Sequence, residues 1–168
     1  GRVIYVGTFS KTLSPSLRLG FVVLPHSLVS HAIALRSLID WQPPITVQET
    51  LLRFIVDGQL DRHLRRTRKV YTERHQMVTD FVHEGVDAGL LVSPSPSHAG
   101  LHITPLLPTG TDELAVVALA RADGIALGNH AQCWLRNDPP AGLLIGFGAT
   151  PTAKLPAALA ALRQVLAG

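Results

Sequence analysis

Two short apolar runs near the start of the chain have the pattern of buried strands. The first spans residues 2–7 and the second spans residues 17–24, and each is nearly continuous in apolar side chains. Runs of this kind are typical of strands that are covered on both faces. The segment between them, residues 8–16, is rich in serine and threonine, so we expect a turn there.

Three helices are expected to follow the second strand. Apolar residues recur at helical spacing over residues 26–41, and the prolines at 43 and 44 stop the pattern. A second helix is predicted over residues 46–56, and the Asp-Gly pair at 57–58 breaks it. A longer helix with one apolar side is predicted over residues 60–81.

Short strands and two helices are predicted for the rest of the chain. The segments with strand character are residues 101–107, 125–127 and 142–148. A helix over residues 114–122 is expected to begin after a cap made by Thr111, Asp112 and Glu113, and a terminal helix is expected over residues 152–166.

The predicted fold class is α/β in two unequal pieces, with the boundary along the helix at residues 60–81. The first piece has two strands and two helices, which is too little to complete a sheet domain, whereas the second piece has enough elements to fold alone. A length of 168 residues fits one domain, or one domain and part of another. Because the chain opens on a strand without a start methionine, we expect an N-terminal part to be missing.

Composition and charge exclude several classes of protein. Hydrophobic residues make up 46% of the chain and charged residues 16%, which excludes a disordered or collagen-like polypeptide. A net charge of +3 is too small to require a nucleic acid or an anionic membrane. No apolar run approaches the roughly 20 residues of a membrane helix. The single cysteine, Cys133, has no internal partner and no leader is visible, so a cytoplasmic protein is expected.

Candidate chemistry is concentrated in residues 7–20, GTFSKTLSPSLRLG. Lys11 lies in the turn between the two expected strands, hydroxyls precede it at Thr8 and Ser10, and Arg18 follows seven residues later. A lysine amine condenses with an aldehyde once it is deprotonated, and a guanidinium with nearby hydroxyls suits a phosphate. This pattern is compatible with an aldehyde cofactor that bears a phosphate. A lysine in a solvated loop explains the same residues, and the spacing alone leaves both interpretations open.

The same segment resembles a known family. Residues 5–13, Pro15 and residues 17–20 are similar to the cofactor-lysine segment of fold-type I pyridoxal phosphate (PLP) enzymes, the aspartate aminotransferase superfamily. The sequence of residues 1–13 most resembles the MocR family. Its members are bacterial GntR-type transcription regulators whose C-terminal region is an aminotransferase-like sensor. Further strings are similar to the same family in the same order: residues 57–68, 100–102 and 139–147. The resemblance covers nearly the whole chain.

The resemblance implies roles for particular residues. Lys11 would bind the cofactor aldehyde covalently and, in an active aminotransferase, would act as the catalytic base. Arg18 would grip the cofactor phosphate, Thr8 would donate a hydroxyl to it, and Ser10 would lie beside it. The implied fold is the C-terminal part of a fold-type I PLP-dependent transferase. Its expected domains are residues 1–60 as a remnant of the PLP-binding large domain, 61–84 as a linking helix and 85–168 as a small C-terminal domain.

The chain departs from the family pattern in two respects. Working aminotransferases of this superfamily usually have an arginine in the last strand that binds the substrate carboxylate, and Leu144 occupies the aligned position. Arg136 is a candidate substitute, although turn chemistry explains it equally well. The upstream half of the fold, which would supply residues that stack on and pair with the cofactor ring, is not in this chain. We therefore predict that these 168 residues alone bind PLP weakly or not at all.

The function implied by the resemblance is an effector sensor. An amino acid or amine would be recognised by PLP on Lys11, DNA would be bound only through an N-terminal winged helix absent here, and the complete protein would be a homodimer. The alternative is a genuine aminotransferase that acts on an α-amino acid, and a remnant without function is a third reading. A cluster of cations at residues 62–74 is expected to be a solvated or packed helix face, and the spacing of His130 and Cys133 gives little support for a metal site.

Overall fold

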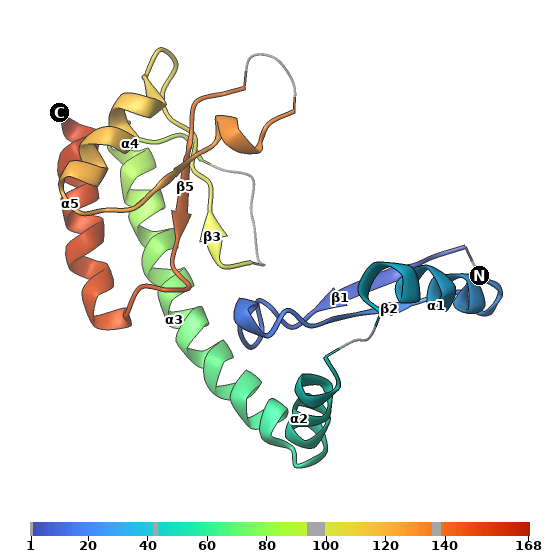
Figure 1. The fold of residues 1–168 in the computed structure, drawn as a ribbon. Coiled ribbons are helices and arrows are strands. Elements are labelled where there is room, and N and C mark those ends of the chain that lie inside the picture. The colour runs from blue at the N-terminus through green and yellow to red at the C-terminus, as the bar shows by residue number, and fades with distance from the viewer. Residues whose placement is uncertain (1, 42–43, 94–99, 136–138) are drawn as a thin grey trace. The chain divides into compact units, whose positions relative to one another are not determined.

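The computed structural model describes residues 2–41, 44–93, 100–135 and 139–168. The chain divides into two compact units, residues 1–66 and 67–168 (Figure 1). The division, between residues 66 and 67, falls inside one continuous helix, α3 (Gln59–Asp87), which the sequence analysis predicted over residues 60–81.

The first unit is built on a two-stranded antiparallel hairpin. Strand β1 (Tyr5–Thr8) pairs with β2 (Gly20–Val23), so that Tyr5 lies opposite Val23 and Thr8 lies opposite Gly20. Helices α1 (His26–Asp40) and α2 (Ile45–Val56) follow, each within a residue or two of the predicted bounds. A 3-10 turn, η1 (Pro15–Leu17), lies within the connection between the strands, at the end where the second strand was expected to begin.

The expectation that both strands are covered on both faces is wrong for this chain. Val6 is 70% exposed and Val22 is 52% exposed, and no described residue of the first unit is buried. The reason is geometric, because a two-stranded ribbon has one neighbour per strand and too few elements to cover two faces. The apolar runs therefore have the composition of buried strands without the elements that would bury them.

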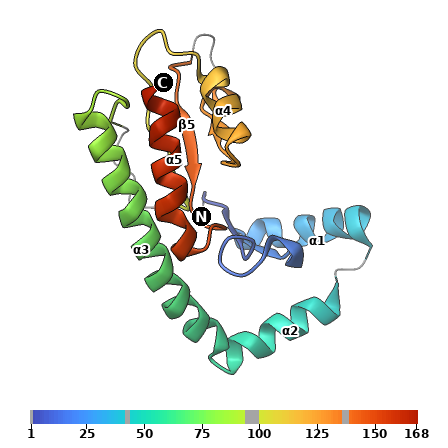
Figure 2. The same cartoon turned by 90° about the vertical axis from the view of Figure 1, so that its left-hand side faces the viewer.

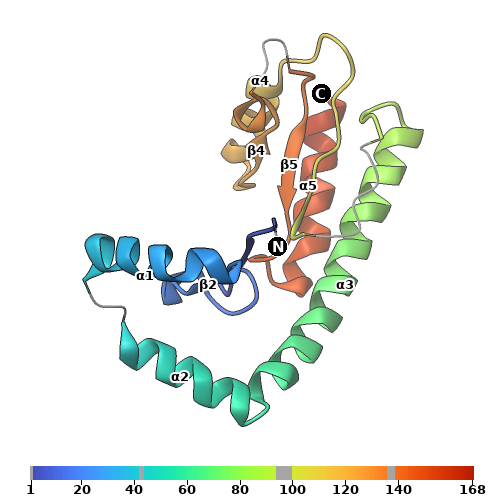
Figure 3. The same cartoon turned by 90° about the vertical axis from the view of Figure 1, so that its right-hand side faces the viewer.

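The second unit has a small antiparallel sheet and three helices. Strand β5 (Leu143–Gly146) lies between β3 (His102–Ile103) and β4 (Gly128–Asn129). Helix α4 (Glu113–Ala122), helix α5 (Leu155–Ala167) and the C-terminal part of α3 complete the unit. Figures 2 and 3 show α5 running alongside β5. Short 3-10 turns η2 and η3 span Ala131–Cys133 and Thr152–Lys154.

One hydrophobic core holds the second unit together. Its side chains come from α3, the sheet, α4 and α5, and the most buried include Val78, Leu143, Phe147 and Leu162. In β5 the burial alternates, because Leu143 and Ile145 are buried whereas Gly146 is exposed. This alternation is typical of a strand with one face on a core.

Helix ends explain two differences from the predicted elements. Residues 125–127 are not a strand, because Gly124 adopts φ 77° and the N–H of Ile125 donates to the carbonyl of Ala120 at 2.8 Å. With the N–H of Gly124 bonded to Arg121, this is a Schellman cap, so Ile125 completes α4. Helix α3 similarly continues past the predicted end at residue 81, to a cap at Gly89 with φ 71°.

The strand predicted over residues 101–107 is shorter in the structure, where β3 is limited to His102–Ile103. Leu106 forms isolated bridges with Val92 and with Gly142. Pro105 interrupts the ladder because it has no N–H to donate. Among the described residues, no helix is long and apolar enough to cross a membrane.

Candidate functional site

The loop between β1 and β2 carries the candidate residues. The two strands approach closely where the loop begins and ends, and we call this close approach the neck of the loop. The N–H of Phe9 donates to the carbonyl of Leu19 at 3.1 Å. A Cβ on Gly20 would lie 2.7 Å from the carbonyl oxygen of Gly7, and a Cβ on Gly7 would lie 2.3 Å from the ring of Phe21. Gly20 is therefore required for the strands to approach, because the obstacle is backbone, whereas a side chain at position 7 would displace the exposed ring of Phe21.

Short-range hydrogen bonds order the loop on each side of Lys11. The N–H of Leu13 donates to the carbonyl of Phe9 at 2.8 Å. The hydroxyl of Ser14 accepts the N–H of Ser16 at 3.2 Å and so caps the 3-10 turn η1. Lys11 lies in the first of these turns and is exposed. Its amine is therefore held on an ordered turn rather than on a free tail.

Two hydroxyls meet at the end of β1. Thr8 Oγ1 lies 3.0 Å from Ser10 Oγ and accepts the N–H of Ser10 at 3.1 Å. This Asx-like turn fixes the two oxygens beside each other, three residues and one residue before Lys11 in the sequence. Each hydroxyl retains the capacity to donate to an anion, because hydroxyl rotors reorient when a stronger acceptor arrives.

Arg18 has an uncommon backbone conformation. Its φ of 49° and ψ of 35° lie in the left-handed region, and its N–H donates to the carbonyl of Pro15 at 3.3 Å. A residue other than glycine in this region is strained unless the surroundings impose it, and such residues gather at functional sites. Within the described part of the chain, neither the guanidinium of Arg18 nor the amine of Lys11 has a hydrogen-bond or ion-pair partner.

A histidine of α3 anchors the loop, and the sequence analysis missed it. His63 Nε2 lies 2.9 Å from the carbonyl oxygen of Thr12, the residue after Lys11. The only signal in the sequence is a histidine within an otherwise cationic stretch of helix. Its partner is 51 residues away, so spacing gives no hint of the contact.

Thr8 ends β1, and Ser10, Lys11 and Arg18 lie on the loop that follows. Arg136, the candidate for a substrate carboxylate, lies outside the described residues. Leu144 is the second residue of β5, half-buried and opposite Gly128. The described residues contain no group of three or more His, Cys, Asp or Glu side chains that would hold a metal ion.

The polar contacts of two residues in the second unit were also missed. Arg74, assigned from the sequence to a cationic cluster, donates from Nε to Thr152 Oγ1 at 3.0 Å and from a terminal nitrogen to the carbonyl of Gly148 at 2.8 Å. Glu113, expected only in a helix cap, accepts the N–H of Gly142 at 2.8 Å and the side-chain amide of Asn129 at 3.1 Å. Both residues position the two ends of β5.

The donor set suits a phosphorylated aldehyde. An exposed amine, a guanidinium without a protein partner and two converging hydroxyls supply one nucleophile and three donors. A guanidinium is the side chain best matched to a phosphate, because its planar fork donates two parallel hydrogen bonds. The residues on this loop therefore fit a group of the PLP type.

Comparisons with known proteins give two kinds of similarity. The chain is 29% identical over 147 residues to the probable rhizopine catabolism regulatory protein MocR of Rhizobium meliloti, covering 88% of this chain and 29% of that protein. It is 31% identical over 148 residues to the uncharacterized HTH-type transcriptional regulator YhdI of Bacillus subtilis, covering 88% and 31%. No family model matches the chain.

A solved structure with the same fold is LysN, the α-aminoadipate aminotransferase of Thermus thermophilus. It was crystallised in complex with N-(5'-phosphopyridoxyl)-L-leucine. The TM-score is 0.86 at 22% identity, over 99% of this chain and 42% of that one. This similarity shows the fold, that of part of a fold-type I aminotransferase. The chain spans under a third of the length of the two regulators that it matches.

Proposed function

We propose that this chain, which is MocR-like in sequence and aminotransferase-like in fold, is the effector-sensing part of a MocR/GntR-type transcription regulator and binds PLP through Lys11. The observation that carries the proposal is the β1–β2 loop and its start, which carry an exposed amine, an unpartnered guanidinium and two hydroxyls that lie 3.0 Å from each other. The similarity to MocR-type regulators supports the regulatory role.

Each residue of the loop has a distinct task in this proposal. Lys11 supplies the amine that holds the cofactor, and Arg18 binds the phosphate through its fork. Thr8 and Ser10 donate to the remaining phosphate oxygens, and His63 holds the backbone next to Lys11. When bound, PLP supplies an aldehyde that an amino compound captures in place of the lysine. If an amino compound took the place of Lys11 on that group, the amine of Lys11 would be released, and this release would be the signal.

The proposal also covers the parts of the chain and its partners. Residues 1–60 belong to a PLP-binding large domain, residues 61–84 form a linking helix and residues 85–168 form a small C-terminal domain. The complete protein is a cytoplasmic homodimer whose effector is an amino acid or amine. It binds DNA through a separate N-terminal domain.

Two cofactors that differ by one group test the role of Arg18. In the complete protein, Arg18→Gln should weaken PLP binding by about 10–100-fold, since a hydrogen bond to a charged group is worth about 1.5–3 kcal/mol. The same variant should bind pyridoxal, which lacks the phosphate, as the unmodified protein does. Lys154→Gln, at another exposed position, is the control and should change neither affinity. Equal losses for PLP and pyridoxal would show that Arg18 does not bind the phosphate.

A turnover assay separates the sensor from the enzyme. The complete protein, loaded with PLP, is mixed with an α-amino acid and 2-oxoglutarate. A sensor exchanges its lysine for the amino compound and produces no more than one equivalent of keto acid. Repeated turnover at an ordinary enzymatic rate, about 1 per second or faster, contradicts the sensor and supports an aminotransferase.

A further inference from the structure

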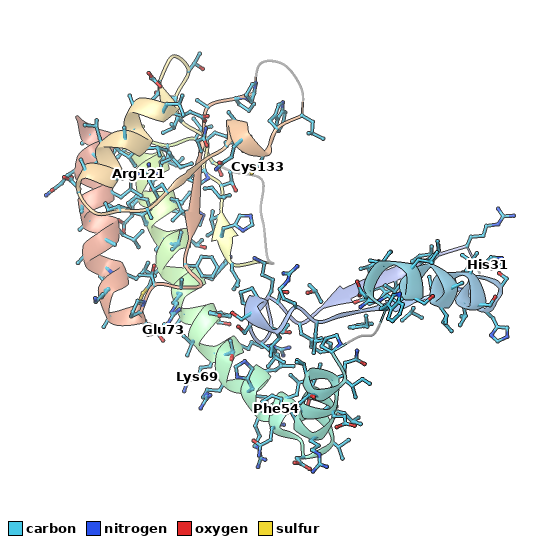
Figure 4. The ribbon with its side chains drawn as sticks, in the orientation of Figure 1. His31, Phe54, Lys69, Glu73, Arg121 and Cys133 are labelled. Atoms are coloured by element: carbon cyan, nitrogen blue, oxygen red, sulfur yellow. The ribbon has the colours of Figure 1, made fainter. Side chains whose placement is uncertain are left out.

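A row of cations on α3 is used neither by the fold nor by the proposed cofactor site. Arg62, Arg65, Arg66 and Lys69 follow at helical spacings of i, i+3, i+4 and i+7, which places them on one face. We call these four residues the cationic row. All four are exposed, and Lys69 projects away from the helix in Figure 4. No carboxylate in the described part of the chain pairs with any of them.

The row lies on the solvent side of its own helix. His63, Thr67 and Val70, which are half-buried, fall on an adjacent side of α3. The one hydrogen bond that a side chain of the row makes is from Arg62 to the backbone carbonyl of Asp57, at 3.4 Å. The row is therefore a continuous strip of charge that spans about 10 Å at 1.5 Å per residue.

The excess charge of the whole chain is concentrated at this place. Residues 61–69 contain five Lys and Arg and one Asp, whereas the complete chain has a net charge of only +3. Like charges three and four residues apart destabilise a helix, and several such pairs occur here. The arrangement opposes the stability of the isolated helix, so an anionic partner would relieve the repulsion.

We propose that the cationic row binds the phosphates of a DNA backbone. The inference rests on the proposed function, in which the complete protein binds DNA, and the Bacillus subtilis relative is an HTH-type regulator. Arg and Lys are the side chains that contact phosphates, and the row itself has no Asn, Gln or aromatic residue for base edges or stacking. The contact is therefore independent of base sequence and supplements a separate reading domain.

The salt dependence of binding gives the measurement. A labelled duplex of mixed sequence is titrated with the 168-residue chain. If four phosphates are contacted, the slope of log affinity against log salt is about −3.6, which weakens binding on the order of 100-fold between about 50 and 200 mM salt. Two variants with the same change of net charge are compared. The row variant is Arg62→Gln, Arg65→Gln, Arg66→Gln and Lys69→Gln. The control variant is Arg2→Gln, Arg53→Gln, Arg121→Gln and Lys154→Gln, at scattered exposed positions.

The two variants have opposite expected outcomes. The row variant should lose most of the affinity and bring the slope close to zero, and the control should keep both close to those of the unmodified chain. Equal losses in the two variants would show that net charge acts without the row, which overturns the proposal. Tighter binding of poly-glutamate than of DNA would also overturn it and indicate an acidic protein partner. Circular dichroism of both variants establishes that the helices persist. None of these measurements involves PLP, so they test the cationic row separately from the proposed role of Lys11.

Discussion

Glu113 is predicted to stabilise the second unit more than any exposed carboxylate does. Its Oε1 accepts the side-chain amide of Asn129 at 3.1 Å and the N–H of Ala131 at 3.3 Å, and its Oε2 accepts the N–H of Gly142 at 2.8 Å. It also lies at the first residue of α4, where the helix dipole favours a negative charge. One side chain thus ties the start of a helix to the segments on either side of η2.

Removal of the Glu113 side chain leaves three N–H donors without their acceptor. In Glu113→Ala the buried N–H of Gly142 loses its acceptor, at a cost of about 1–3 kcal/mol, and the two half-buried donors lose less because water reaches them. The free energy of unfolding should therefore fall by about 2–4 kcal/mol. In Glu113→Gln one acceptor remains and the side-chain amide of Asn129 turns to present its oxygen, so the loss should be roughly half as large.

Urea denaturation followed by circular dichroism measures the effect. The midpoint should fall in the order unmodified, Glu113→Gln, Glu113→Ala, at an unchanged m value. Glu73→Ala is the matched control, since Glu73 is an exposed helical glutamate, and it should stay within about 0.5 kcal/mol. Amide exchange at Gly142 should accelerate in Glu113→Ala. A Glu113→Ala midpoint equal to that of the control would refute the reasoning.

Three further results are expected. Leu162 is 1% exposed in the core, so Leu162→Ala should lower the free energy of unfolding by about 2–5 kcal/mol in urea denaturation. A loss below about 1 kcal/mol would contradict the assigned core. Gly20→Ala should weaken the hairpin, because the added Cβ meets the carbonyl of Gly7, and hydrogen exchange of the Phe9 amide should become faster. An unchanged exchange rate would contradict the close approach of the strands at the neck of the loop. The 168-residue chain alone should bind PLP at least 100-fold more weakly than the complete protein does in an absorbance titration, and comparable affinities would contradict the need for the rest of the fold.

The sequence predicted helices better than strands, for physical reasons that particular residues show. Helices α1 and α2 end near prolines or an Asp-Gly pair, and these signals act locally. The prediction of a strand at residues 125–127 was wrong because Ile125 belongs to the cap of α4. A short apolar run does not show whether it forms a strand or part of a helix cap. Whether the hairpin is exposed depends on which other elements cover it, and the composition of its strands does not show whether those elements are present.

The candidate loop residues were predicted from the sequence, and the long-range contacts of His63 and Arg74 were not. Lys11 and Arg18 lie in a continuous motif, so the resemblance identified them together with Thr8. His63 contacts the loop from 51 residues away, and Arg74 reaches a carbonyl 74 residues away. Contacts at these separations follow from tertiary packing, and one sequence without a structure does not encode them in any local pattern.

The most direct test of the account is the site of covalent attachment of PLP in the complete protein. The loaded protein is reduced with borohydride and digested, and the modified peptide is identified by mass spectrometry. The chain has three lysines, Lys11, Lys69 and Lys154. The account predicts a stoichiometric adduct on Lys11, none on the other two, and none anywhere in this chain for Lys11→Ala. An adduct spread over the three lysines, or one that persists in Lys11→Ala, would contradict it.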